Sequence, residues 1–71
     1  MTADELCARL QAMPPGGVEV LSRRQLKRLF AEEATQNARK DAAVALGECC
    51  HCDVAVLGAD EMFVRFTRRA D

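Results

Sequence analysis

The sequence contains no tryptophan, no tyrosine and no isoleucine, and only three phenylalanines among its 71 residues. Apolar residues make up 49% of the chain, but twelve of them are alanines, each of which buries little surface. A chain of this length buries only about 60% of the surface that it exposes when unfolded. The composition therefore predicts one small domain over residues 1–71, with a core that a partner chain, a metal ion or disulfides would help to stabilise.

Long apolar runs are absent as well, and those present fall far short of the roughly 20 residues that a membrane-spanning helix needs. The first residues, MTADEL, have neither the basic segment nor the apolar segment of a secretory signal peptide. We therefore expect a cytoplasmic protein with no membrane partner.

Signatures of catalysis and of phosphate binding are also missing. The segment PPGG at residues 14–17 lacks the lysine and the helix cap of a phosphate-binding loop. His51 is next to cysteines, but adjacent residues rarely hold a nucleophile and its base in hydrogen-bond geometry, and no third residue orients them. The acid pairs Glu32–Glu33 and Asp60–Glu61 are typical of a solvated helix surface and a solvated loop tip. We therefore expect a non-catalytic protein without a cofactor.

Cysteine and histidine are concentrated in one segment, GECCHCDV, at residues 47–54. Structural zinc sites use four ligands, usually two pairs whose members are separated by two to four residues. The ligand types at Cys49–Cys52 are contiguous, and neighbours on a strand point to opposite faces, so they cannot all reach one ion. Cys7 would have to complete the set from the start of the chain. The sequence therefore favours the absence of a metal site.

The cysteines are better interpreted as ordinary core residues. Free cysteine behaves as a small hydrophobe, so Cys50 and Cys52 are expected to be buried, with His51 facing solvent beside Asp53. The run has no neighbouring lysine or arginine in the sequence that would stabilise a thiolate. Three nearly adjacent cysteines also give no spread disulfide framework, so reduced thiols are expected.

A capping box and a proline–glycine segment delimit the first helix. Thr2 followed by Glu5 predicts a helix over TADELCARLQAM, which the segment at residues 14–17 ends. The alternating residues VEVL at positions 18–21 then predict a short strand.

Ser22 and Gln25 form a second capping box, which predicts a helix beginning at Arg23. Beyond this helix the sequence admits two interpretations. Thr35 can cap a new helix, but an apolar ladder from Leu26 to Cys49 fits one continuous helix equally well.

Gly47 is the predicted stop signal of this helical segment, although the helix can fray on through Cys49. After it, Cys52–Leu57 and Met62–Arg68 alternate apolar and polar residues on either side of the segment GADE at residues 58–61. Two such runs around a short glycine-containing loop predict a β-hairpin.

Taken as helix, strand, helix, helix, strand, loop and strand, the chain resembles a winged helix-turn-helix domain. The first helix is TADELCARLQAM, the short strand is VEVL and the second helix is LSRRQLKRLF. The resemblance implies that TQNARKDAAVAL is the recognition helix and that DVAVLGADEMFVRF is the wing hairpin. It also implies an α+β fold with helices packed on a C-terminal β-hairpin, and it requires a break near Thr35.

Charge is distributed in bands, although the net charge is only −1. Residues 22–40 carry six basic and two acidic side chains, a local charge of +4. Residues 41–61 carry five acids and no lysine or arginine, a local charge of −5, and residues 62–71 return to +2. This banding favours a binding role for the basic segment.

The resemblance and the basic band together nominate a binding surface. A recognition helix places its N-terminal side chains in the major groove, where Gln and Asn suit adenine and Arg and Lys suit guanine. Cations near the start of the second helix oppose the helix macrodipole, a cost that a phosphate would relieve. The candidate DNA-contacting or partner-contacting residues are therefore Arg23, Arg24, Lys27, Arg28, Gln36, Asn37, Arg39, Lys40, Arg65 and Arg68.

Other functions compete with DNA binding, because the loop GADE is acidic and many DNA-binding domains are more basic overall. Arg28 can also pair with Glu32, four residues later, on a solvated helix face. The alternative function is a protein-binding adaptor or an inhibitor of a larger complex, of the phage- or plasmid-type accessory class, acting through the same basic surface. A third interpretation is a redox or metal sensor built on Cys49–Cys52.

We also expect the chain to associate with a second protein chain. Leu6 and Leu10 are not expected both to be covered in so small a monomer if the hairpin packs on the second helix as well. We therefore expect a homodimer or a heteromeric complex.

Overall fold

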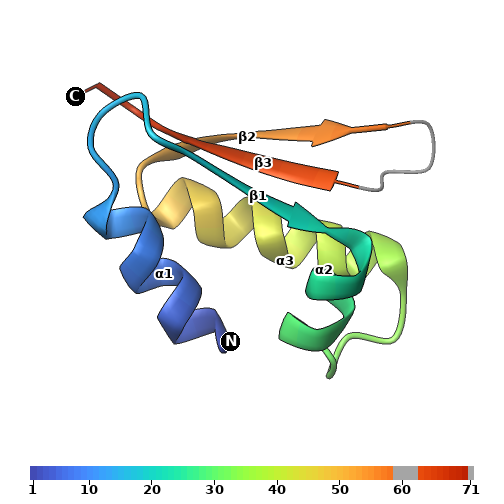
Figure 1. Cartoon of the computed structure of the whole chain (residues 1–71). Helices are drawn as coiled ribbons and strands as arrows, with labels where there is room; N and C mark the ends of the chain where they lie inside the picture. Colours follow the sequence, from blue (N-terminus) through green and yellow to red (C-terminus); the bar gives the residue numbers. More distant parts are fainter. Residues whose placement is uncertain (59–62, 71) are drawn as a thin grey trace.

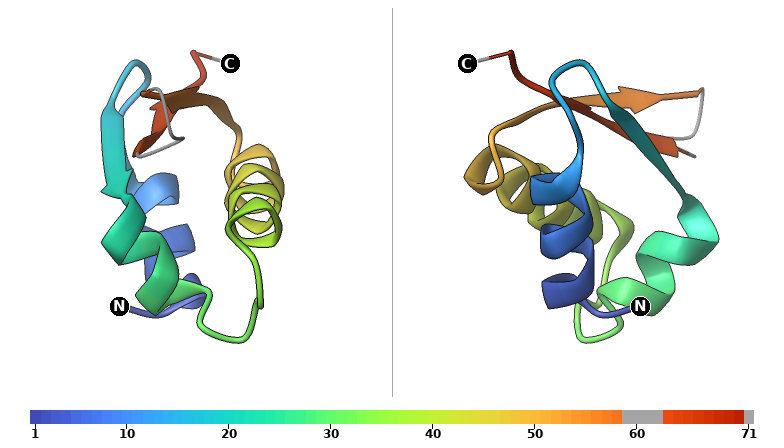
Figure 2. Two further views of the ribbon diagram at one scale, coloured as in Figure 1. Left: turned by 90° about the vertical axis from the view of Figure 1, so that its right-hand side faces the viewer. Right: turned by 60° about the vertical axis from the view of Figure 1, so that its left-hand side comes forward.

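The structure, a computed structural model, describes residues 1–58 and 63–70. Within them the chain is an α+β fold with six elements: α1 (Ala3–Ala12), β1 (Val18–Ser22), α2 (Arg23–Leu29), α3 (Gln36–Cys49), β2 (Cys52–Leu57) and β3 (Phe63–Arg68). The strands form one antiparallel sheet in the order β1-β3-β2. All three helices lie on one side of this sheet (Figures 1 and 2).

The helix starts follow the predicted caps. The Thr2 hydroxyl accepts a hydrogen bond from the Glu5 amide at 3.2 Å, and the Glu5 carboxylate accepts one from the Thr2 amide. Before α3, the Thr35 hydroxyl accepts from the Ala38 amide at 3.1 Å. Because α2 ends at Leu29 and α3 begins only after Thr35, the single continuous helix is excluded and the predicted break is confirmed.

The predicted hairpin is present, and β1 joins it. β2 pairs with β3 from Cys52 opposite Arg68 to Leu57 opposite Phe63. The described part of β3 begins at Phe63, so the prediction that this strand starts at Met62, and the loop that precedes it, lie outside the described residues. β1 pairs with the other edge of β3, which makes the C-terminal strand the centre of the sheet.

The core lies between the sheet and the helices. Its buried residues are Leu6, Leu10, Leu21, Leu26, Ala43, Cys50, Cys52, Val64 and Phe66. The expectation that a monomer would leave Leu6 or Leu10 uncovered is wrong, because both are 0% exposed within the single chain. They are covered because α1 packs against both α3 and β3. The argument from uncovered leucines for a dimer or heteromer is thereby removed.

Gly47 does not stop α3, so the predicted stop is wrong, and the alternative extension of the helix through Cys49 is confirmed. Gly47 is buried, because here the helix backbone approaches the sheet closely. The residue that adopts the left-handed conformation after the helix is His51, with φ of 61°. The amide of His51 donates to the Glu48 carbonyl at 3.2 Å, and that of Cys50 to the Leu46 carbonyl at 3.1 Å.

In the described part of the chain, no helix has the length and apolar character needed to cross a membrane.

Candidate functional site

The cations of α2 face outward because of how the helix is built. Ser22 and Gln25 form the predicted capping box, with the Gln25 side-chain oxygen 2.8 Å from the Ser22 amide. Leu26 is the one residue of this seven-residue helix that is buried in the core. Anchoring the helix through Leu26 leaves four cationic side chains exposed: Arg23, Arg24, Lys27 and Arg28.

These four cations have no ion pair with any described carboxylate. The alternative pairing of Arg28 with Glu32 requires both residues on one helix, but α2 ends at Leu29. The structure therefore excludes that interpretation of Arg28 as one half of a helical i,i+4 pair. An exposed positive cluster with no ion pair among residues 1–58 and 63–70 remains at one end of the fold.

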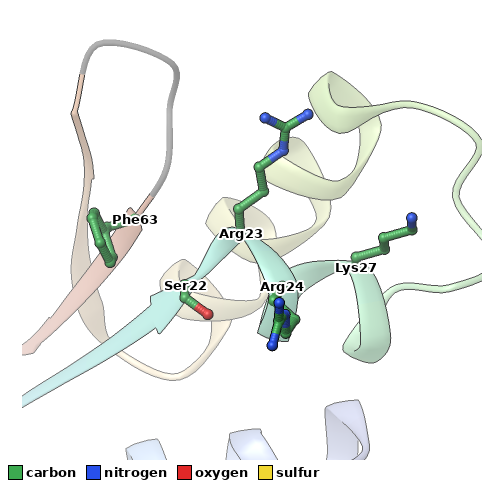
Figure 3. A pocket seen from close by; sticks show the side chains of 5 residues that line it. All are labelled: Ser22, Arg23, Arg24, Lys27 and Phe63. Atoms are coloured by element: carbon green, nitrogen blue, oxygen red, sulfur yellow. The ribbon is translucent and has the colours of Figure 1, made fainter.

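An open pocket lies at the junction of β1, α2 and β3 (Figure 3). It has a volume of about 660 Å³ and is lined by Ser22, Arg23, Arg24, Lys27 and Phe63. Phe63 is directly opposite Ser22 in the sheet register, which brings this ring to the start of α2, and it is 43% exposed. We call these five residues the basic–aromatic pocket.

Sequence reasoning missed Phe63. The alternation of residues along β3 could have indicated that Phe63 is exposed. Val64 and Phe66 point into the core, so Phe63 must point outward. Its place beside α2 depends on the pairing of β1 with β3, which connects residues far apart in the sequence.

The two arginines predicted on β3 occupy different positions. Arg65 is exposed on the outward side of the sheet, two residues after Phe63 and opposite Val20. Arg68 is half-buried, and its Nη1 atom donates to the Cys50 carbonyl at 2.7 Å. Arg65 therefore lies on the same side of the sheet as Phe63 without lining the basic–aromatic pocket, whereas Arg68 is held against the end of α3.

The predicted DNA-contacting residues of α3 also differ in their exposure. Asn37 is exposed, and Gln36 and Lys40 are half-buried. Arg39 is half-buried, and its Nε atom is enclosed without a hydrogen-bond partner among the described residues. Arg39 precedes buried Ala43 by one turn, so it lies on the inward side of the helix and does not join the exposed residues.

The exposed side of α3 carries carboxylates after its first turn. Its exposed residues are Asn37, Asp41, Ala45, Glu48 and Cys49. An anionic ligand is therefore compatible with the first turn of α3 and is repelled farther along it.

The cysteine-rich segment holds no cluster of three or more potential metal ligands among the described residues. Cys50 and Cys52 are buried in the core and His51 is exposed, as predicted. Burial raises the pKa of the Cys50 thiol to about 12, with a further contribution from the hydrogen bond to Cys7. Burial also raises the pKa of Cys52, and the positive charges of Arg68 and Arg69 partly oppose this rise.

Comparisons with protein-family models, with curated proteins and with solved structures found no match to the chain. Function is therefore inferred from the site itself. Its distinguishing features are four exposed cations without an ion pair to any described carboxylate, an exposed aromatic ring beside three of them, and an uncharged first-turn Asn37 on the neighbouring helix.

Proposed function

We propose that this chain is a non-catalytic nucleic-acid-binding module with a winged-helix-like arrangement, and that its ligand is duplex DNA. The element order, the separation of α2 from α3, and a sheet in the order β1-β3-β2 support the arrangement. In such modules the third helix approaches the major groove and the preceding helix contacts the DNA backbone.

The observation that carries the proposal is the exposed positive charge of α2, which no described carboxylate pairs. Arg23 and Arg24 occupy the first turn, where cations oppose the helix macrodipole, and no described carboxylate offsets them. A surface with this cost is stabilised when phosphate groups bind to it, and each phosphate contact also releases counterions from DNA. Arg23, Arg24, Lys27 and Arg28 are therefore the proposed phosphate contacts.

Base contacts are proposed for the first turn of α3. The exposed Asn37 can form paired hydrogen bonds to adenine, and Gln36 and Lys40 lie beside it. Asp41 and Glu48 lie beyond the first turn and repel phosphate groups there, so the helix enters the groove by its N-terminal end and not along its length. The earlier expectation of a base contact from Arg39 is dropped from the proposal, because that side chain points inward.

Fluorescence anisotropy with labelled duplex DNA, single-stranded DNA and RNA at several salt concentrations tests the proposal. Arg24→Gln should weaken binding to every duplex sequence about equally and reduce the slope of log K against log salt by about 0.9, the value for one phosphate contact. The matched control is Arg9→Gln, which removes the same charge from α1, where Arg9 is paired with Glu19 at 2.8 Å.

The control variant should bind as the unmodified protein does. The proposal fails if no duplex binds more tightly than about 10⁻⁴ M at moderate salt, the weak end of non-specific affinity. It also fails if Arg9→Gln and Arg24→Gln weaken binding equally, because only net charge would then matter.

A second candidate function, a protein-binding adaptor or inhibitor, is favoured by the outward side of the sheet. No helix of the described chain covers it (Figure 2), and Val18, Val20, Leu57 and Phe63 are between 38% and 52% exposed there. Exposed apolar side chains gathered on one face are typical of protein contacts and add little to phosphate binding.

Sedimentation velocity over a wide concentration range separates the two functions. If a second copy or a protein partner binds this face, Val18→Ser with Val20→Ser should abolish the association and leave DNA affinity unchanged. A concentration-independent monomer that still binds DNA would remove self-association from consideration.

A further inference from the structure

Two cysteines distant in the sequence meet at one end of the fold. Cys7 lies in the middle of α1, and Cys50 caps the C-terminus of α3. Their Sγ atoms are 2.7 Å apart, which is within about 0.7 Å of the length of a disulfide bond. All four cysteines are free thiols in this structure.

The backbone around Cys50 is held in place by its neighbours. Its carbonyl oxygen accepts a hydrogen bond from Arg68 Nη1 at 2.7 Å and one from the Cys52 thiol at 3.7 Å. Its amide donates to the carbonyls of Leu46 and Gly47, both at 3.1 Å. Cys50 is therefore pre-positioned toward Cys7, and cross-linking requires only a small approach of the two sulfur atoms.

We propose that Cys7 and Cys50 form a reversible intramolecular disulfide when the protein meets a low-molecular-weight disulfide oxidant. The proposal rests on the facing thiols and is independent of nucleic-acid binding. Where thiols are kept reduced, the pair rests as two thiols, and oxidising conditions convert it to the cross-link.

The reaction is a two-step thiol–disulfide exchange. Cys7 loses its proton to solvent, its thiolate attacks one sulfur of the small disulfide, and the other half of that molecule leaves as a thiolate. Cys50 then loses its proton, its sulfur attacks the Cys7 sulfur, and the second half leaves. Each leaving thiolate takes up a proton, so two protein thiols lose two electrons and two protons, and the oxidant becomes two small thiols.

Accessibility decides the order of these steps. Cys7 is half-buried, whereas Cys50 is fully buried, so the external disulfide reaches Cys7 first. The hydrogen bond and the charge of Cys7 both help to raise the pKa of Cys50. Once Cys7 is in a mixed disulfide it carries no negative charge, and deprotonation of Cys50 becomes easier.

The product would tie α1 covalently to the C-terminal end of α3. In the sequence, α1 precedes β1 and α2, and α3 follows them. The cross-link therefore closes a long loop that contains β1 and α2. Closing a long loop restricts the unfolded chain and raises the stability of the oxidised form.

The test treats the purified, reduced protein with oxidised glutathione, alkylates the remaining thiols, and measures the intact mass and the peptide map. The unmodified protein should retain two alkylatable thiols in place of four, with a cross-link between Cys7 and Cys50 that dithiothreitol reverses. Thermal unfolding should shift to a higher midpoint on oxidation and return on reduction.

Matched variants assign the cross-link. Cys49→Ser removes the exposed neighbouring thiol and should leave the cross-link intact, whereas Cys7→Ser should abolish it. In a chain with Cys49→Ser and Cys52→Ala, Cys7 and Cys50 are the two cysteines that remain. After oxidation, both thiols should become inaccessible to the alkylating reagent together. Retention of all four thiols, a mixed disulfide that persists on Cys7, or cross-linking only between chains through Cys49 would each overturn the proposal.

Discussion

Gly47 of α3 lies directly against the ring of Phe66 in β3. A Cβ atom at position 47 would be 2.7 Å from Cδ1 and 2.9 Å from Cε1 of that ring, and it would also collide with Cγ2 of Val54. Both neighbours belong to strands that carry the core, and Phe66 is 0% exposed. The absence of a side chain at position 47 is therefore what allows α3 to pack onto the sheet.

Gly47→Ala should lower the free energy of unfolding by about 1–3 kcal/mol, the usual cost of overpacking a core. This loss outweighs the gain of up to about 1 kcal/mol that alanine brings to a helix. Urea denaturation measures the difference. Ala45→Gly, at an exposed position of the same helix, is the control and should lose only about 1 kcal/mol. A Gly47→Ala protein more stable than the original would contradict the close packing.

His51→Gly should raise the stability. His51 is exposed and has φ of 61°, a conformation that costs a side-chain-bearing residue roughly 1–2 kcal/mol and costs glycine almost nothing. Glycine also loses more entropy on folding, so the net gain should be up to about 1 kcal/mol in thermal or urea denaturation. His51→Val, with a β-branched side chain, should instead destabilise the fold, and equal stability of the two variants would be inconsistent with the left-handed backbone.

Stability should fall at alkaline pH. Burial raises the pKa of Cys50 from 9.0 to about 12 in the folded protein, so the unfolded chain loses this proton first as pH rises. The contribution is fully present below about pH 9 and declines above it by up to about 1.4 kcal/mol per pH unit. Urea denaturation at pH 8 and at pH 10–11 under reducing conditions measures this decline. Cys50→Ala should show a shallower decline, and a stability independent of pH across this range would argue against a buried thiol.

Asp41→Asn should strengthen DNA binding. Asp41 is an exposed carboxylate one turn beyond Asn37 on α3, so the proposed docking places it near phosphates. Removing its charge should raise affinity by up to about fivefold at low salt, because two unit charges roughly 4 Å apart in water interact by about 1 kcal/mol. Anisotropy titrations measure this gain.

Asn37→Ala should instead reduce the preference among duplex sequences, at a cost of about 1–3 kcal/mol for the best site. Competition among duplexes that differ at single base pairs measures this preference. If Asn37→Ala weakens all sequences equally, Asn37 does not read bases.

Chelation should leave the fold unchanged. The described residues hold no group of three potential metal ligands, and two of the cysteines are core residues. The helical circular-dichroism signal of the reduced protein should therefore be the same with and without a strong chelator. One equivalent of bound metal per chain, with unfolding on its removal, would contradict this expectation.

Local chemistry made parts of the fold predictable. The pairs Thr2 with Glu5 and Ser22 with Gln25 place two helix starts, because each cap involves residues only three apart. The presence of Thr35 was not sufficient to predict whether this segment forms one helix or two, because the apolar ladder through α2 and α3 has the same spacing in both cases.

Long-range contacts determined what the sequence could not predict. The role of Gly47 depends on the approach of Phe66, and a glycine at a helix end is locally indistinguishable from a stop signal. The inward position of Arg39 depends on which side of α3 meets the sheet. The covering of Leu10, the place of Phe63 and the pairing of Cys7 with Cys50 likewise require elements far apart in the chain to meet.

β3 is both the central strand of the sheet and the last of the described elements in chain order. Within the described residues, β1 and β2 pair only with β3, so neither strand has this backbone partner until residues 63–68 have been synthesised. Val64 and Phe66, which fill the core beneath the helices, arrive at the same late stage. A growing chain must therefore carry two unpaired strand edges and an open core up to that point, and this interval is when a chaperone or another nascent chain has access to it.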